Sequence, residues 1–265
     1  MIIIVILSAV SIFGYATFIL HPQLLSYFSW APSVFAMSFS FFSQALIILG
    51  FLVLAYECQK SLGLRWLRYF TAAYLISITM ELASTTYGIP FGKYAYTTLL
   101  GSKILDHVPY LIPLSWFFMA VPSFCLAELI LGSFKNRWLK VTLASLLLVT
   151  WDFTLDPVMS KLTPFWVWEE PGPTVLDVPI KNLAGWFLTG ILICSAFELL
   201  KFKTPKKWIE NSFPLKFYAA NLLLPVGLAI AGQIWLALAA TILVFLFCGC
   251  LAIGTGGVKN FRAQK

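Results

Sequence analysis

The sequence predicts an all-α fold: a bundle of about eight membrane-spanning helices, with seven as the alternative, in one integral-membrane domain over residues 1–265. Two observations lead to this fold class. Apolar residues make up 60% of the chain and charged residues 11%, and the mean hydropathy is +0.88. Soluble domains are about 45–50% apolar and about 25% charged, so this chain has too few polar residues to cover a water-soluble globule. The apolar residues also fall into runs long enough to cross a bilayer.

Each predicted helix is a run of about 20 mostly apolar residues, the length that the hydrocarbon core requires. The first run has neither the basic residues nor the small-residue cleavage site of a signal peptide, so it is expected to remain as a span. The third run is the least hydrophobic. Little more than Ala231, Gly232 and Gln233 separates the last two, which predicts a tight hairpin or a broken re-entrant pair. The runs are 2–20, 34–56, 68–86, 108–132, 138–156, 183–200, 214–231 and 233–253.

The basic residues predict the orientation of the bundle. If both termini are cytoplasmic, 14 of the 18 lysines and arginines lie on the cytoplasmic side in strict alternation, as the positive-inside rule requires. The net charge of +7 therefore indicates topology, and no nucleic-acid partner is expected. The cytoplasmic set is Lys60, Arg65, Arg68, Lys135, Arg137, Lys140, Lys201, Lys203, Lys206, Lys207, Lys216, Lys259, Arg262 and Lys265, and the outer set is Lys93, Lys103, Lys161 and Lys181.

The five cysteines have no metal-ligand spacing, and no metal site is expected. Cys248 and Cys250 are two residues apart, so on a helix their side chains point away from each other. They are better interpreted as small apolar residues of the core.

Acidic residues inside the spans are the first candidates for chemistry, because a charge within the hydrocarbon is costly. Glu57, Glu128 and Glu198 fall near cytoplasmic ends, where a basic loop residue is the expected partner. The others gather toward the opposite face: Glu81, Asp106, Asp152, Asp156, Glu169, Glu170 and Asp177.

Asp152 and Asp156 lie one helical turn apart in WDFTLDP, so both carboxyl groups share a face. Two like charges this close in a low dielectric cannot both ionise cheaply, and one is expected to keep its proton. A protonated carboxyl group can act as an acid at neutral pH. The alternative is that the pair binds a lysine or caps the helix end.

Aromatic and turn-forming residues are dense in the two long outer loops, 87–107 and 157–182. The fourth span carries Pro109, Pro113 and Pro122, and such irregular helices are tolerated where they line a cavity. An interfacial aromatic belt accounts for some of the rings. Rings beside a carboxylic acid also suit a site that shelters a carbocation. The rings at this level are those of Tyr87, Tyr94, Tyr96, Trp116, Trp151, Trp166 and Trp168.

Three segments resemble the integral-membrane carotenoid biosynthesis proteins that include the carotenoid 1,2-hydratases. They are ELASTTYGIPFGKYAYTTLLGSKILDHVPYLIPLSWFFM (81–119), WDFTLDPVM (151–159) and VPIKNLAGW (178–186). The resemblance implies addition of water across the terminal 1,2 double bond of an acyclic carotenoid end, as in γ-carotene or a C50 precursor, to give a tertiary alcohol. It implies no metal or organic cofactor. The partners that it implies are a lipophilic carotenoid and the bilayer.

For this chemistry we expect one of Asp152 and Asp156 to be the acid. Glu81 is expected to orient the water as a base, or to be the partner of the acid. Asp106 and His107 are expected to support these groups, in a site toward the non-cytoplasmic face. The residues expected to support or line the site are Tyr87, Tyr94, Tyr96, Trp116, Trp151, Asn182 and Trp186.

Other functions fit parts of the pattern. A membrane carotenoid cyclase would make the same cation and then close a ring, giving an isomer of the substrate, whereas the product of a hydratase is heavier by one water. A prenyltransferase is disfavoured, because D-F-T-L-D is a lone D-x-x-x-D and binding a diphosphate through Mg²⁺ calls for several carboxylates. A transporter would also show broken helices and intramembrane acids.

Overall fold

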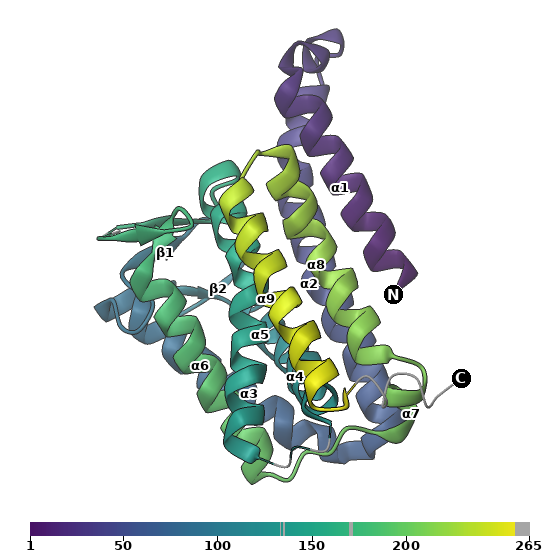
Figure 1. Ribbon diagram of the computed structural model, residues 1–265. Helices are drawn as coiled ribbons and strands as arrows, with labels where there is room; N and C mark the ends of the chain where they lie inside the picture. Colours follow the sequence, from purple (N-terminus) through teal and green to yellow (C-terminus); the bar gives the residue numbers. More distant parts are fainter. Residues whose placement is uncertain (133, 135, 170–171, 258–265) are drawn as a thin grey trace.

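The chain folds into long helices and a few short strands (Figure 1). The computed structural model describes residues 1–132, 134, 136–169 and 172–257. Lys135, Glu170, Lys259, Arg262 and Lys265, which entered the sequence predictions, lie outside these residues. The long helices are α1 (Ile2–Leu20), α2 (Ala31–Leu62), α3 (Trp66–Tyr87), α4 (Ile112–Leu131), α5 (Arg137–Pro157), α6 (Ile180–Leu199), α8 (Phe213–Ala231) and α9 (Trp235–Gly254).

Shorter elements connect these helices. The helical ones are η1 (Pro22–Tyr27), η2 (Gly63–Arg65), η3 (Val158–Leu162) and α7 (Lys206–Glu210). The strands are β1 (Tyr94–Tyr96), β2 (Lys103–Ile104), β3 (Val108–Pro109), β4 (Trp166–Trp168), β5 (Thr174–Val175) and β6 (Val178–Pro179).

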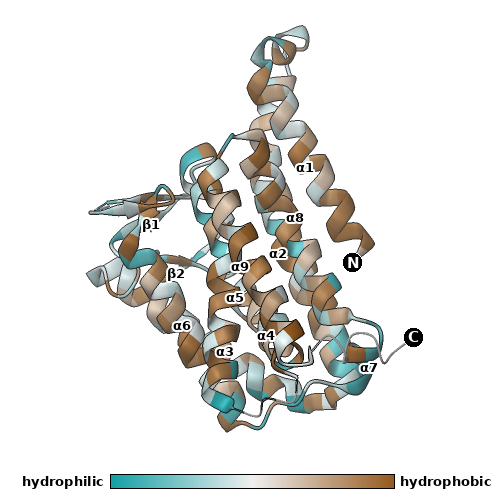
Figure 2. Ribbon diagram, viewed as in Figure 1, coloured by the Kyte–Doolittle hydropathy of each residue, from teal (hydrophilic) through white to brown (hydrophobic). Residues whose placement is uncertain are grey.

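Seven helical stretches of the described chain are long and apolar enough to cross a membrane. One of them, Ala31–Tyr87, contains both α2 and α3, joined by the short turn η2. Hydrophobic residues run along the helices, and hydrophilic ones gather at their ends (Figure 2). The prediction of an all-α, polytopic membrane bundle is therefore confirmed. The orientation of the termini stays a prediction.

The predicted fourth span begins too early. Residues 108–111 are not helical, because Val108 and Pro109 pair with Lys103 and Ile104 in the hairpin β2–β3, and α4 begins at Ile112. The last two predicted spans form a hairpin, in which α8 ends at Ala231 and α9 begins at Trp235. Cys248 is buried and Cys250 is exposed, as their spacing predicts.

Helix α4 lies at the centre of the bundle. All of its residues except Leu114 and Glu128 are buried, and it packs against α2, α3, α5 and α8. Helices α1 and α9 lie at the edge and leave large apolar side chains exposed, as expected where lipid replaces water as the solvent. Among the described acids near the predicted cytoplasmic ends, Glu198 pairs with Lys140 at 2.7 Å and Glu128 accepts a hydrogen bond from Thr204.

A proline inside α8 fixes the position of a tryptophan on α5. Pro225 has no N–H, so the carbonyl of Asn221 one turn earlier lacks its helical donor. The indole N–H of Trp151 donates to that carbonyl at 3.2 Å. In a membrane span a freed carbonyl needs such a partner, and here the partner holds the indole between the two helices.

The two long loops, 87–107 and 157–182, are joined by a two-stranded antiparallel sheet. Strand β1 pairs with β4, with Tyr94 opposite Trp168 and Tyr96 opposite Trp166. Side chains alternate between the faces of a strand, so these four rings point to one side, whereas Ala95 and Val167 are exposed on the other. The sheet is thus an aromatic roof at one end of the bundle.

Candidate active site

Glu81 is buried on α3 and accepts three hydrogen bonds from side chains. The hydroxyls of Tyr94 and Tyr96 both donate to Oε2, the latter at 2.9 Å. The indole N–H of Trp116, on α4, donates to Oε1 at 2.9 Å. Donors that converge on a carboxyl group favour its ionised form. The arrangement therefore suits a carboxylate held in a fixed position.

The two tyrosines remain donors over a wide pH range. Burial under the roof, together with the neighbouring Glu81 carboxyl group, raises the pKa of Tyr94 and of Tyr96 well above the usual value near 10. Lys103 donates to the backbone carbonyl of Tyr96, which fixes the strand that carries both hydroxyls.

Asp152 and Asp156 lie on α5, and both are buried. The side-chain amide of Asn182, on α6, donates to Oδ2 of Asp152 at 3.3 Å and to Oδ2 of Asp156. The two carboxyl groups therefore lie on one face of α5, as their spacing predicts. Among the described residues neither forms an ion pair with a lysine or arginine, and Oδ1 of Asp152 has no hydrogen-bond partner.

The two aspartates and Glu81 thus have different environments. Three donors surround one carboxyl group, whereas a single amide serves the other two. Two carboxyl groups with one shared donor and no cation nearby are stabilised when one of them holds a proton. The site therefore has two carboxyl groups that can share a proton on one wall, and a carboxyl group held by three donors on another.

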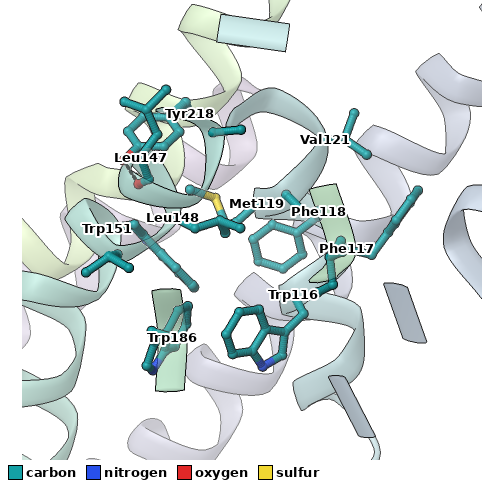
Figure 3. Close-up of a cluster of buried hydrophobic side chains, with 14 of the residues drawn as sticks. Trp116, Phe117, Phe118, Met119, Val121, Leu147, Leu148, Trp151, Trp186 and Tyr218 are labelled. Atoms are coloured by element: carbon teal, nitrogen blue, oxygen red, sulfur yellow. Dashed lines mark hydrogen bonds between the residues drawn. The ribbon is translucent and has the colours of Figure 1, made fainter. Parts of the chain in front are cut away.

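The indole rings of Trp116, Trp151 and Trp186 belong to one cluster of buried side chains (Figure 3). Trp186 follows Asn182 by one turn of α6, and its ring stacks on that of Trp116 with centroids 4.0 Å apart. The rings of Trp151 and Trp186 form a T-shaped pair with centroids 5.9 Å apart. Gly185 allows the loop after α3 to pack closely, because a Cβ there would lie 2.4 Å from Cδ1 of Phe91. Aromatic faces of this kind attract a positive charge.

These groups line one cavity beneath the roof. Its empty space is about 950 Å³ including the open mouth. Glu81, Asp156 and Asn182 face this space, whereas Asp152 lies behind Asp156 and does not line it. The lining rings from the predicted set are those of Tyr94, Tyr96, Trp116, Trp151 and Trp186, joined by Trp166 and Trp168.

Three of the predicted supporting residues lie outside the cavity. Tyr87 is 78% exposed at the end of α3. Asp106 and His107 are exposed in the turn between β2 and β3. Leu105 and Asp106 adopt positive φ there, as a tight hairpin turn requires, and this turn directs the side chains away from the carboxyl groups. The structure therefore corrects their expected support of the acid and the base.

Other lining residues had no place in the predicted site. They include Ile4 and Ser8 on α1, Ser43 and Leu46 on α2, and Asn221, Leu224 and Pro225 on α8. Asn221 carries a signal that the sequence analysis missed, because it is an amide within an apolar span, four residues before a proline. The aliphatic residues carry no such signal, since they resemble the lipid-facing residues of any span.

The sequence is similar to a known protein family and to a known enzyme. The model of a family described as "Carotenoid biosynthesis protein" matches residues 42–248. A bisanhydrobacterioruberin hydratase of Haloarcula japonica is 34% identical over 128 residues, which are 47% of this chain and 42% of the relative. The chain thus matches less than half the length of that protein. No solved structure matches this chain.

Proposed function

This chain belongs to the carotenoid biosynthesis protein family, and from that premise we propose that it is a carotenoid 1,2-hydratase. The proposed enzyme adds water across the terminal double bond of an acyclic carotenoid end group and leaves a tertiary alcohol. The hydratase of Haloarcula japonica supports this reaction type at a distance. The observation that carries the proposal is the apolar cavity lined by two carboxyl groups with different hydrogen bonding: Glu81 accepts from three donors and Asp156 from one amide.

The proposed reaction begins with a proton transfer from Asp156. An isolated trisubstituted alkene is a weak base, so it reacts only with an acid held against it. The π electrons bind the proton at the less substituted carbon, and the neighbouring carbon becomes a tertiary cation. The indole faces of Trp116 and Trp186 line the same cavity and stabilise a cation electrostatically.

Water then completes the reaction with help from Glu81. A carboxylate has about four lone-pair positions, and the three described donors leave one free on Oε1. A water bound there would bond to the cation through its oxygen and release a proton to Glu81. The net change is alkene plus water to alcohol. Return of the proton from Glu81 to Asp156 through water restores the site.

We assign Asp152 a positioning role. It does not line the cavity, but it shares the amide of Asn182 with Asp156. Two carboxyl groups one turn apart are stabilised when they share a proton, so the pair keeps a proton available next to the cavity that Asp156 lines. We further propose, from the distribution of basic residues in the loops, that the cavity opens toward the non-cytoplasmic face.

Expression in a host that makes lycopene or γ-carotene tests the proposal, with the pigments separated by chromatography and weighed by mass spectrometry. The wild type should give a product heavier by one water, and Asp156→Asn should give none. Asp152→Asn should keep a reduced activity. Glu210→Gln, a change of the same kind on the exposed helix α7, is the matched control.

Each other outcome has a defined meaning. Full hydration by Asp156→Asn would refute the assigned acid. A product of unchanged mass but altered retention would favour a cyclase, in which a ring closes on the cation before water arrives. Unaltered pigments in cells that contain the folded wild type would refute the enzymatic function.

A further inference from the structure

A second cavity lies between α1 and α2. It is bounded by the second half of α1, the turn η1 and the first half of α2, and residues 159–165 and α8 close its base. Its empty space is about 1250 Å³ including the open mouth. Figure 1 shows that α1, η1 and the start of α2 extend beyond the ends of the other helices. The groove therefore lies along the ends of α1 and α2 that project beyond the other helices (Figure 1).

This groove adjoins the catalytic cavity. Five residues line both spaces: Ser43, Leu46, Met159, Phe165 and Leu224. Along α2 its lining extends from Ala31 to Leu46, and a rise of about 1.5 Å per residue makes this length about 22 Å. The two spaces are therefore neighbours, and the carboxyl groups of Glu81 and Asp156 line only the catalytic cavity.

The groove wall is mainly apolar. Among the described residues that line it, none is charged. The hydroxyls of Ser11, Ser38 and Ser43 donate to carbonyls of their own helices at 2.6–2.8 Å, so they are already satisfied. Rings such as those of Tyr15, Phe35 and Phe39 make up much of the remaining surface. A ligand with hydrogen-bonding groups along its length would lose its bonds to water here without replacement.

We propose that this groove binds the polyene chain of the carotenoid while its end group reacts in the catalytic cavity, an inference that rests on the proposed function. A polyene is long, apolar and free of hydrogen-bonding groups, and it matches the groove in each respect. Its burial supplies binding energy remote from the reacting bond, which holds the end group against Asp156. The opening between α1 and α2 is then the path by which the pigment enters from the bilayer.

Gly14 provides a way to block the groove without disturbing the fold. It lies on α1 in the groove wall, and no atom lies within 4 Å of the position that a Cβ would take. A larger side chain therefore has room, and it would occupy the space assigned to the polyene. Gly249 on α9 is the matched control, because it too has no atom within that distance and lines neither cavity.

The experiment compares Gly14→Phe, Gly249→Phe and the wild type on two substrates, with the unfolding temperature of each purified protein as the test of folding. One substrate is the carotenoid, and the other is an acyclic isoprenoid alkene with the same end group but too short to pass Ser43 and Leu46. We expect Gly14→Phe to reduce hydration of the carotenoid by about tenfold or more. Displacing two carbon groups of the polyene from the groove already costs enough apolar burial for a tenfold loss of binding. The short alkene should react equally with all three proteins.

Three results would overturn the groove assignment. The first is equal hydration of the carotenoid by Gly14→Phe and the wild type. The second is a folded Gly14→Phe that loses hydration activity equally on both substrates. The third is a loss of carotenoid hydration in Gly249→Phe as large as that in Gly14→Phe. If Gly14→Phe does not fold, Gly14→Leu is judged by the same criteria. A wild type that hydrates neither substrate would refute the proposed function, and the groove assignment would fall with it.

Discussion

Replacing Glu81 by glutamine would remove the proposed base while keeping the size of the side chain. The carboxylate accepts from two tyrosine hydroxyls on Oε2 and from the indole N–H of Trp116 on Oε1. Glutamine has one acceptor oxygen and one NH₂ group. If its NH₂ faces Trp116, two donors oppose each other. If it faces Tyr94 and Tyr96, the hydroxyls must turn to accept.

The size of each effect follows from these contacts. A buried donor left without a partner costs about 1–3 kcal/mol, so the free energy of unfolding should fall by that amount at most. Loss of a general base costs about 10²- to 10⁴-fold in rate. The activity of Glu81→Gln should therefore fall far more than its stability.

Two measurements separate these effects. Pigment analysis in carotenoid-producing cells gives the yield of hydrated product per folded protein, and denaturant unfolding in detergent gives the stability. Glu210→Gln serves again as the exposed control. A folded Glu81→Gln that makes wild-type amounts of hydrated product would refute the role of Glu81. A yield that falls only in proportion to the folded protein would reduce Glu81 to a structural residue.

Two further predictions concern the walls of the cavity. Trp151→Phe should lower the free energy of unfolding by about 0.6–1.7 kcal/mol more in the wild type than in the Pro225→Ala background. The reason is that an alanine at position 225 restores a helical N–H donor to the carbonyl of Asn221, which the indole of Trp151 otherwise serves. Strictly additive effects of the two substitutions would contradict this explanation. Because burial and Glu81 raise the pKa of Tyr94 and Tyr96, their contribution to stability should be complete below about pH 10 and lost as the pH rises through the higher pKa of the folded state. Unfolding measured from pH 8 upward checks this, and the double Tyr→Phe variant should lose less stability than the wild type at the alkaline end.

Much of the fold could be predicted because the bilayer allows few structures. The run 2–20 coincides with α1, since an apolar stretch of that length has little choice but to form a helix in lipid. The helix beginning at Ile112 shows where this reasoning ends. Residues 108–111 are as apolar as the rest of the predicted span, so hydropathy includes them in the helix. They are instead held in the β2–β3 hairpin, which depends on the positive φ of Leu105 and Asp106, and residue types alone do not predict that backbone conformation.

The candidate site could be predicted only in part, and for a similar reason. Asp152, Asp156 and Glu81 were identifiable because buried acids are rare in spans. The contact between Asn182 and both aspartates depends on how α5 packs on α6, and hydropathy has no information on that packing. Asp106 and His107 are close to α4 in the sequence, but the turn directs them outward.

The positions of the hydrogen-bond donors along the chain also bear on how the protein is made. The three donors to Glu81 all follow it within 35 residues, and Asn182 follows Asp152 by 30. At a synthesis rate of about 5–20 residues per second, each acid emerges from the ribosome only seconds ahead of the group that satisfies it. The pairing of β1 with β4 joins segments that are synthesised further apart. Strand β4 emerges after all three donors to Glu81 but before Asn182, so Glu81 can be satisfied before the roof closes, whereas Asp152 and Asp156 gain their amide donor only after β4 has been made.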